Sequence, residues 1–422
     1  MSKFGCPEKF ILMVRQFHDG MLARVLADGE YSEPFPVTNG VKQGCVLAPT
    51  LFSMVFTAML TDAYHDGVDG ISIKYRMDGS VFNLRRLQAI TKVKETIIRD
   101  FLFADDCALN ASSESELQIS MNKFSAACDN FGLTISTKKT EVMHQPSPRT
   151  HYTEPTILVN GQRLQTVDKF TYLGSTLSRA VTIDAEVNNR IAKASSAFGR
   201  LRTNVWERRG ITAATKLKVY SAIVFPTLLF ACESWTVYQR HARQLNHYHT
   251  TCLRRILRIK WQDKVPDTDV LSRSNQPSIY TLLMRAQIRW AGHIARMPDE
   301  RIPKQLLYGE LSNGKRSVGG QKKRFKDTLK TSLKSFNINT ATWDKLAGNR
   351  STWRDLIFKG CQASEERRTV DAKQKRELRK SRAASASTSD ASLVCPSCSR
   401  AFRAKIGLIS HLRTHRTQSS ST

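Results

Sequence analysis

The chain has 422 residues, 41% of them hydrophobic, and a formal net charge of +28 with a pI near 10. Its length allows two or three domains with a sizeable core. So large a positive charge favours a polyanionic partner, nucleic acid first and a membrane surface second. No window of 18 apolar residues exists, and the longest apolar run, Val219–Cys232, contains Pro226 and is too short to span a membrane.

The N-terminus and the cysteines narrow the cellular context. Residues 1–17 carry Glu8, Arg15 and a proline, which does not match a secretory signal peptide. Nine cysteines are scattered along the chain, except for one close pair at 395 and 398. This pattern favours a reducing compartment with one metal site over a disulfide framework. We therefore expect a nuclear or cytoplasmic protein that is neither secreted nor inserted in a membrane.

The first 61 residues predict two helices separated by strands and a glycine-rich loop. Residues 7–20 have helical apolar spacing, and a strand pair with an Asp-Gly turn at 28–29 follows. In the segment 38–49 two glycines flank Gln43, and a proline precedes a predicted helix over 50–61. Gln43 is a candidate for contact with a base or template edge, although a plain glycine-rich loop explains this segment equally well.

Two adjacent carboxylates, Asp105 and Asp106, lie between the apolar runs 101–104 and 107–109. Short apolar runs with Asp at their junction predict two strands joined by a tight turn. An unneutralised Asp-Asp tip is costly because like charges repel, and a hard cation such as Mg²⁺ relieves that cost. An ordinary exposed turn is the alternative, and the dipeptide alone favours it.

The surrounding segments up to residue 175 also predict regular elements. We expect a hairpin with an Asp-Gly turn over 71–84 and an amphipathic helix over 114–131 that ends at Gly132. A short strand is predicted at 133–136, and the segment 169–175 is strand-like.

Four of these segments form an ordered set. They are Gly-Val-Lys-Gln-Gly…Ala-Pro-Thr-Leu-Phe at 40–52, Phe-Ala-Asp-Asp at 103–106, Gly-Leu-Thr-Ile-Ser…Lys-Thr at 132–140 and Phe-Thr-Tyr-Leu-Gly-Ser at 170–175. In this order they resemble the palm domain of reverse transcriptases from non-LTR (LINE-type, RTE-like) retrotransposons. The resemblance covers residues 1–180 directly, and the rest of the chain looks like the C-terminal part of the same elements.

The resemblance implies a Mg²⁺ site and its neighbours. Asp105 and Asp106 match the metal-binding carboxylates, and Phe103 stands in front of them where Tyr is usual. Lys139 matches the basic residue near the leaving pyrophosphate, where an ammonium group can donate a proton or offset charge.

The resemblance also implies residues that hold the substrates. Gln43 and Gly44 match the loop that touches the template and the incoming nucleotide. Tyr172, Leu173 and Gly174 match the centre of the segment that grips the primer end.

One family feature is expected to be missing from this chain. Polymerases of this type hold two metals with the Asp pair and one further Asp on an earlier palm strand. In the family that strand lies just before a segment like 2–7, so we expect the strand, the fingers and any endonuclease domain to be absent. Asp19 and Asp28 lie upstream of the pair but lack the apolar-Phe-Asp setting, and we interpret them as turn residues.

From about 183 to 294 the pattern becomes helical. Residues 185–201 are amphipathic, 213–231 are strongly apolar, and 248–257 mix apolar and arginine positions. These predict a thumb-like helical domain that lies along a duplex with its basic side outward, although a solvated helix face explains most single Lys and Arg residues. Four tryptophans are interpreted as core anchors rather than base-stacking platforms. They are Trp206, Trp235, Trp261 and Trp290.

Residues 301–382 contain 22 Lys and Arg against 8 Asp and Glu, which is half of the excess charge. A basic glycine-rich loop at 315–324 suits phosphate contacts, which give affinity without sequence choice and weaken with salt. A charged helix is expected over 365–382, with a candidate nuclear import signal at 373–382, followed by a disordered linker over 383–392. The candidate phosphate contacts are Lys315, Arg316, Lys322, Lys323 and Arg324.

The C-terminal segment has the spacing of a Cys-Cys-His-His zinc finger, with Cys395, Cys398, His411 and His415 as ligands. Two thiolates and two imidazoles give tetrahedral Zn²⁺, and binding the ion contributes most of the folding free energy of such a module.

Sequence-specific DNA reading by this finger is not expected. The helix positions that usually read bases fall on Ala404, Gly407 and Ser410, which lack the bidentate reach of Arg, Asn or Gln. Contact with phosphates or RNA is favoured instead. The candidate side chains are Arg403, Lys405, Arg413 and Arg416.

Together these features predict an α+β protein. It comprises a partial polymerase palm over 1–180, a helical thumb-like domain over 181–300, a basic helical connection over 301–382, the linker over 383–392 and a ββα zinc finger over 393–418. The predicted function is that of an RNA-directed DNA polymerase fragment that binds RNA and DNA mostly through phosphates and does not polymerise alone. The alternative is a zinc-finger nucleic-acid-binding protein whose palm remnant is only a scaffold. A third hypothesis is that the palm, short of one strand, does not fold stably.

Overall fold

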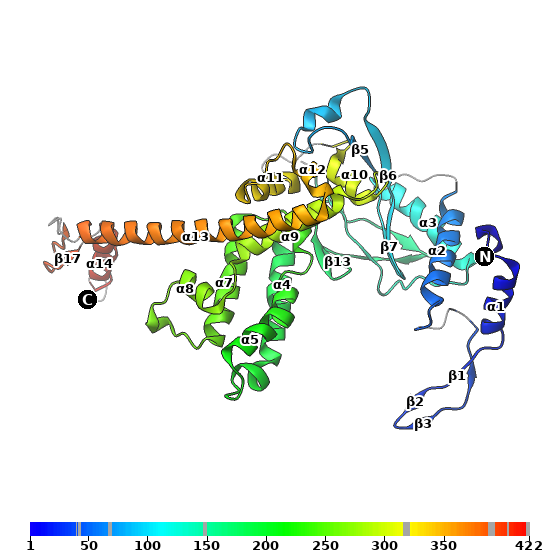
Figure 1. Cartoon of the computed structure of the whole chain (residues 1–422), viewed down its shortest axis with the longest axis horizontal. Coiled ribbons are helices and arrows are strands. Elements are labelled where there is room, and N and C mark those ends of the chain that lie inside the picture. Colours follow the sequence, from blue (N-terminus) through cyan, green and yellow to red (C-terminus); the bar gives the residue numbers. More distant parts are fainter. Residues whose placement is uncertain are drawn as a thin grey trace.

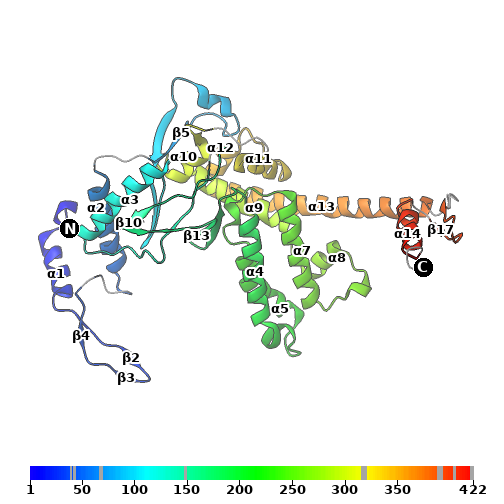
Figure 2. The same ribbon diagram turned by 180° about the vertical axis from the view of Figure 1, so that it is seen from behind.

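An N-terminal α/β part, a bundle of helices and one long helix follow one another along the chain (Figure 1). In both views, α13 (Arg350–Ala386) extends from the body and carries the C-terminal elements at its far end (Figures 1 and 2). The mixed content of helices and strands confirms the predicted α+β class. The computed structural model describes residues 1–38, 40, 44–65, 70–146, 150–314, 321–386, 393–402 and 405–418.

The N-terminal elements are a helix, a strand arm and a second helix, as predicted. α1 (Glu8–His18) leads into the arm, and α2 (Ala48–Tyr64) begins with a proline in its first turn. The arm turns at Asp28 and Gly29, whose φ angles of 51° and 89° suit the turn that closes a two-residue hairpin. Its strands are β1 (Leu22–Ala23), β2 (Leu26–Ala27), β3 (Glu30–Tyr31) and β4 (Phe35–Pro36).

The predicted hairpin over 71–84 is wrong. β5 (Ile71–Tyr75) pairs on one side with β6 (Lys94–Ile98) and on the other with β15 (Gly309–Leu311), so a distant segment completes the sheet. Between β5 and β6 the buried guanidinium of Arg86 donates to the carbonyls of Asp78 (2.9 Å) and Tyr308 (2.8 Å). These hydrogen bonds hold the connecting segment against the C-terminal part, and a local Asp-Gly signal does not reveal such a partner.

α3 (Glu114–Asn130) forms as predicted and ends before Gly132, which has φ 67°. The strand predicted at 133–136 does not form, because Leu133 and Ile135 instead pack against the cluster between α2 and α3. The neighbouring short strands pair with one another. They are β9 (Glu141–Val142) with β12 (Gln165–Thr166), and β10 (Leu158–Val159) with β11 (Gln162–Arg163).

The region from 184 to 295 is a helical bundle around one apolar core, which confirms its predicted helical character. Fully buried side chains from six helical elements meet there, among them Val187, Leu228, Leu245 and Val270. The helices, including the π-helical turns η3 and η4, are α4 (Asp184–Arg200), η3 (Arg202–Trp206), α5 (Ala213–Val219), η4 (Tyr220–Val224), α6 (Phe225–Leu228), α7 (Gln239–Ile256), α8 (Asp267–Ser274) and α9 (Ile279–Ala295).

The tryptophans of this bundle do not share one environment. Trp206 and Trp235 are buried and Trp290 is half-buried, as expected of core anchors. Trp261 is 84% exposed, so its predicted core role is wrong. It lies in the short turn between α7 and α8. Ile259 and Val265 anchor this turn on the core, and the indole ring does not.

A second core joins α9 to the basic C-terminal region. α10 (Ile302–Tyr308), α11 (Phe325–Ser335) and α12 (Trp343–Gly348) pack there with α13, and Val81 from the N-terminal part enters the same cluster. Residues on both sides of position 300 therefore share one core, and the predicted domain division there stays a prediction.

α13 is much longer than the predicted helix over 365–382. It begins at Arg350 and continues to Ala386, into the predicted linker, whose residues 387–392 lie outside the described part of the chain. Glu365 fixes it to the start of α9 by accepting hydrogen bonds from the hydroxyls of Ser278 (2.7 Å) and Thr281 (2.5 Å). Across the described residues, no helix is long and apolar enough to cross a membrane.

A buried histidine in the bundle gives a testable pH dependence. The His249 ring is fully buried, its Nδ1 lies 2.7 Å from the Tyr220 hydroxyl, and burial lowers its pKa to about 4. In the unfolded chain the pKa is about 6.5. Between these values the unfolded state binds more protons than the folded state, so the free energy of unfolding must fall as the pH falls.

We therefore expect urea unfolding of the bundle to lose up to about 1.4 kcal/mol per pH unit between pH 6.5 and 4.5 because of this one group. The variant His249→Asn should be less stable at neutral pH. Its free energy of unfolding should also change less with pH in that window, by the contribution of about one bound proton. Equal slopes for the two chains would contradict the assignment of a neutral, buried His249.

Candidate metal and nucleic-acid sites

The Asp pair lies at the tip of a two-stranded hairpin, as predicted. β7 (Asp100–Phe103) pairs antiparallel with β8 (Asp106–Leu109). Ala104 turns the chain with φ 53°, Asp105 completes the turn, and Asp106 is the first residue of β8. Both aspartates are exposed, so water and substrate phosphates can reach them.

This tip fits a hard divalent cation. Mg²⁺ takes one or two carboxylates and completes its octahedron with waters and substrate phosphates, which needs an exposed rather than an enclosed carboxylate pair. Burial raises the pKa of the neighbouring Cys107 thiol to about 11. Asp19 follows the last residue of α1 and Asp28 lies in the turn of the arm, which confirms both as turn residues.

A second hairpin lies against the first. β13 (Lys169–Tyr172) pairs with β14 (Ser175–Ser178) across a turn at 173–174, where both residues have positive φ. The Tyr172 hydroxyl donates to the carbonyl oxygen of Phe101 (2.9 Å) and lies 3.3 Å from that of Asp106. The predicted primer-grip tyrosine therefore touches the backbone of the Asp-Asp hairpin, a contact that the sequence did not reveal.

α4 holds this second hairpin from the other side through a buried ion pair. Arg190 donates to Glu186 Oε1 (2.6 Å), and both side chains are about 95% buried. Glu186 Oε2 accepts from the amide of Thr176 (2.7 Å), and Arg190 also donates to the carbonyl of Gly174. Sequence reasoning missed this pair, although its i, i+4 spacing inside a predicted amphipathic helix was a usable signal.

Of the other residues predicted to contact the substrates, those that the structure describes lie in turns and at a strand end. Gln43 lies outside the described residues, and Gly44 has φ 88° in the turn that precedes α2. Phe103 is 63% exposed at the end of β7. Lys139 is exposed in a turn, and its backbone amide donates to the carbonyl of Ser136 (3.0 Å). That these residues share a substrate with the Asp pair stays a prediction.

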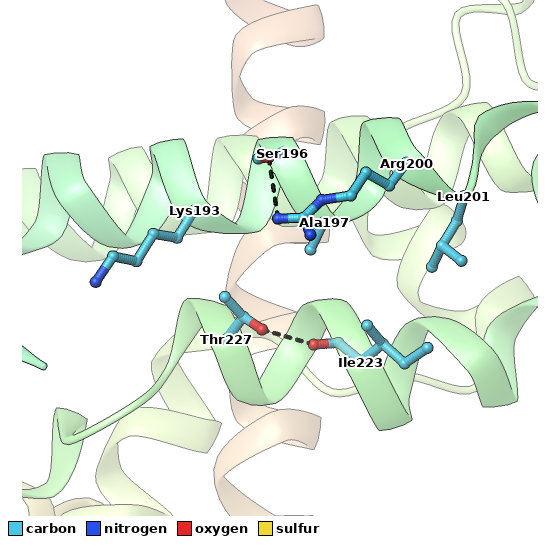
Figure 3. A pocket seen from close by; sticks show the side chains of 7 residues that line it. All are labelled: Lys193, Ser196, Ala197, Arg200, Leu201, Ile223 and Thr227. Atoms are coloured by element: carbon cyan, nitrogen blue, oxygen red, sulfur yellow. Dashed lines mark hydrogen bonds between the residues drawn. The ribbon is translucent and has the colours of Figure 1, made fainter. Parts of the chain in front are cut away.

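A hollow of about 560 Å³ opens between α4 and the segment formed by η4 and α6 (Figure 3). Lys193 and Arg200 lie two turns apart along its α4 side, and Arg200 donates to the Ser196 hydroxyl (3.4 Å). The opposite wall is mostly apolar, with Ile223 and the methyl of Thr227. Two cations above an apolar floor suit a phosphodiester strand better than a small apolar ligand.

The basic loop is partly engaged inside the protein. Lys315 and Arg316 lie outside the described residues. The amide of Lys323 donates to the Tyr238 hydroxyl (2.9 Å), and its side chain borders a cavity of about 360 Å³ between α7, α9, α11 and α13. Arg324 pairs with Glu310 (2.9 Å), and Lys322 is exposed.

The C-terminal module is a short hairpin followed by a helix. β16 (Leu393–Val394) pairs with β17 (Ala401–Phe402), and α14 (Lys405–Gln418) follows. The amide of Cys395 donates to the Arg400 carbonyl and the amide of Ser399 donates to the Cys395 carbonyl (both 2.9 Å), which closes a knuckle around the cysteines.

This knuckle and α14 bring the four predicted zinc ligands together. The donor atoms of Cys395, Cys398, His411 and His415 all lie within 4.8 Å of one another. His411 Nε2 is 3.0 Å from both the Cys398 sulfur and His415 Nε2. Four such donors fit around one tetrahedral Zn²⁺ at about 2.0–2.3 Å from each atom.

The chain is similar to known polymerases over its N-terminal part. Residues 1–177 match the family "Reverse transcriptase (RNA-dependent DNA polymerase)". A putative uncharacterized transposon-derived protein of Caenorhabditis elegans is 24% identical over 60% of the chain and 93% of its own length. RNA-directed DNA polymerases from the mobile element jockey of Drosophila melanogaster and Drosophila funebris are 23% and 24% identical over 62% of the chain. Residues 1–177 are therefore similar to a reverse transcriptase domain, and these relatives are products of mobile elements.

The matched region spans only 26% of either jockey polymerase, so their whole activity does not transfer to this chain. Within residues 1–177, the β13–β14 hairpin contacts the Asp-Asp hairpin directly through the Tyr172 hydroxyl. The Glu186–Arg190 pair lies beyond residue 177 and joins this part of the chain to the helical bundle.

The buried ion pair predicts a large loss of stability when one partner is removed. Arg190→Met should lower the free energy of unfolding by about 3–5 kcal/mol, because Glu186 is left buried and charged without its cation. The double variant Glu186→Leu/Arg190→Met should recover much of that loss. Urea unfolding of the three chains measures both effects.

The matched control is Arg202→Met, which breaks a pair with Glu207 in which both side chains are more than half exposed. That substitution should leave the unfolding midpoint unchanged. A loss for Arg190→Met no larger than that for Arg202→Met would contradict the role given to the buried pair.

Proposed function

We propose that this chain is a retrotransposon reverse transcriptase segment that binds RNA and DNA through phosphates and does not extend a primer by itself. The observation that carries the proposal is the Asp105–Asp106 tip, which offers two carboxylates. Two-metal phosphoryl transfer in the family implies a third. The upstream candidates, Asp19 and Asp28, lie in a helix end and in the turn of the arm and do not supply it.

Charge and exposure support binding to a phosphate backbone. The net charge is +28, and Lys193 and Arg200 line an open hollow between α4 and the η4–α6 segment. The exposed half of α13 adds Lys373, Lys375 and Arg379. Contacts of this kind supply affinity without sequence preference. The same basic stretch on α13 is the candidate import signal, which would place the protein in the nucleus rather than the cytoplasm.

The parent reaction assigns a task to each of this chain's site residues. When bound, Mg²⁺ would be held by Asp105 and Asp106 and would neutralise charge on the substrate phosphates. Lys139 would offset charge on the leaving pyrophosphate. Gly44 and Gln43 would lie against the template and the incoming nucleotide, and the Tyr172-Leu173-Gly174 turn would hold the primer end at the Asp-Asp hairpin.

Primer extension tests the proposed inactivity. Purified chain with Mg²⁺ or Mn²⁺, an RNA template and an annealed DNA primer should give no more product than the variant Asp105→Asn. Retention of the same primer-template in an anisotropy assay shows that the substrate is bound. Extension by the wild-type chain that Asp105→Asn abolishes would refute the proposal, because it would show a complete metal site.

A second function is favoured by the zinc cluster: a zinc-finger nucleic-acid-binding protein in which the reverse transcriptase domain is only a scaffold. The four donor atoms lie within 4.8 Å, and the module sits at the far end of α13 (Figures 1 and 2). Gly407 and Ser410 provide no bidentate base contact from α14, so this finger would also bind phosphates or RNA.

Deletion of residues 393–422 separates the two functions. On the first proposal the truncated chain keeps most of its affinity for nucleic acid, and its dependence on salt changes little. The full chain should contain one Zn²⁺ and the truncated chain none, measured by mass spectrometry of native protein. Cys398→Ser is the matched control, since it removes one ligand but no basic residue. Loss of binding in both altered chains would favour the zinc-finger function.

A further inference from the structure

Trp261 stands apart from the other tryptophans of the protein. Trp206, Trp235, Trp343 and Trp353 are at most 6% exposed, whereas Trp261 is 84% exposed. Burial of an aromatic side chain of this size is worth several kcal/mol, so its exposure gives up a stabilising contribution. An exposed indole ring in a turn is therefore available to a partner.

The turn that carries Trp261 is fixed rather than loose. Arg254 closes its base by donating to the Val265 carbonyl (2.8 Å) and to Asp267 (2.7 Å). Inside the turn, the Lys260 amide donates to the Asp263 carboxylate (2.7 Å). Ile259 and Val265 on either side pack against the bundle core. The indole ring is thus held outward by the anchoring of its neighbours.

The residues around this ring are basic. Arg258, Lys260 and Lys264 are all exposed within three positions of Trp261. Two of them, Arg258 and Lys264, take left-handed backbone conformations with φ 57° and 49°. The acid of the turn, Asp263, already accepts from the Lys260 amide. An aromatic face with three cations around it matches the chemistry of an unpaired nucleotide, whose base stacks and whose phosphates are anionic.

The exposed basic stretch of α13 adjoins this region. Arg376 donates to the Thr268 hydroxyl of α8 (3.1 Å), which joins α13 to the helix that follows the Trp261 turn. Lys373, Lys375 and Arg379 of α13 are exposed on either side of that contact. Exposed cations of α13 therefore lie beside the helix that follows the Trp261 turn.

We propose that the turn at 258–264 is a single-strand binding platform, in which an unpaired base stacks on Trp261 and the flanking phosphates pair with Arg258, Lys260 and Lys264. This rests on the proposed nucleic-acid binding and adds the strandedness of the ligand. Inside a duplex, the flat faces of each base are covered by the neighbouring base pairs. Stacking on Trp261 is therefore expected of single strands. The competing partner is an anionic membrane surface, to which an exposed tryptophan among lysines could also bind.

The test compares single-stranded and duplex probes on the full, zinc-loaded chain. Fluorescein-labelled oligo(dT), oligo(U) and a blunt DNA duplex are titrated in an anisotropy assay against wild type, Trp261→Ala, Trp261→Phe and Lys260→Ala/Lys264→Ala. Tyr31→Ala is the matched control, because Tyr31 is 69% exposed but stands next to Glu30. Thermal melting of every variant shows that the fold is kept.

Trp261→Ala should weaken binding of both single strands by roughly fivefold or more and change duplex binding less than twofold. Trp261→Phe should keep most of the affinity, and the double lysine variant should weaken all three probes. Equal effects of Trp261→Ala on single strand and duplex, or no effect on either, would overturn the platform while leaving nucleic-acid binding intact.

Two further outcomes would overturn nucleic-acid binding itself or assign the turn to a membrane. Absence of any binding by the wild-type chain would overturn the platform together with the nucleic-acid binding of the proposed function. Vesicles of phosphatidylcholine with phosphatidylserine provide the membrane arm. A blue shift of the tryptophan emission that occurs with these vesicles but not with oligo(dT), and that Trp261→Phe removes, would assign the turn to a membrane surface instead.

Discussion

The buried pair of Glu186 and Arg190 is the constraint on which the relation between the two halves of the protein depends. Each charge is nearly without solvent, so each requires the other, and both use their remaining hydrogen-bonding capacity on the backbone of the β13–β14 hairpin at Thr176 and Gly174. That hairpin in turn meets the Asp-Asp hairpin through the Tyr172 hydroxyl. These polar contacts therefore link the Asp-Asp hairpin to the helical bundle through the β13–β14 hairpin.

A second join, far from the first in sequence, ties the reverse transcriptase domain to the C-terminal region. The family match ends at residue 177, yet β5 inside it pairs with β15 at 309–311, and Arg86 bonds to the Tyr308 carbonyl. Val81 enters the core that α9 shares with α11 to α13. The described part of the basic region thus packs into the same folded body as β5 and Val81.

What the sequence predicted well was local. Periodicity, turn residues and ligand spacing located α1, α3, the Asp-Asp hairpin and the four clustered Cys and His residues, because each signal lies within one short segment of the chain. The errors involve distant partners. The strand partner of β5 comes from 309–311, and the apolar residues 133–136 pack on helices instead of entering a sheet. The core role predicted for Trp261 was wrong for a local reason. A large apolar side chain is expected in the core, but here Ile259 and Val265 pack against the core and the indole ring stays exposed.

The Asp-Asp hairpin can form whether or not a metal ion is bound. Both carboxylates are exposed, so water screens their repulsion and the turn forms at modest cost with or without a cation. The strands around the turn are held by their ladder and by Tyr172, none of which involves a metal. The geometry of the tip is thus independent of a bound metal, whereas on the proposed function its chemistry depends on a third carboxylate.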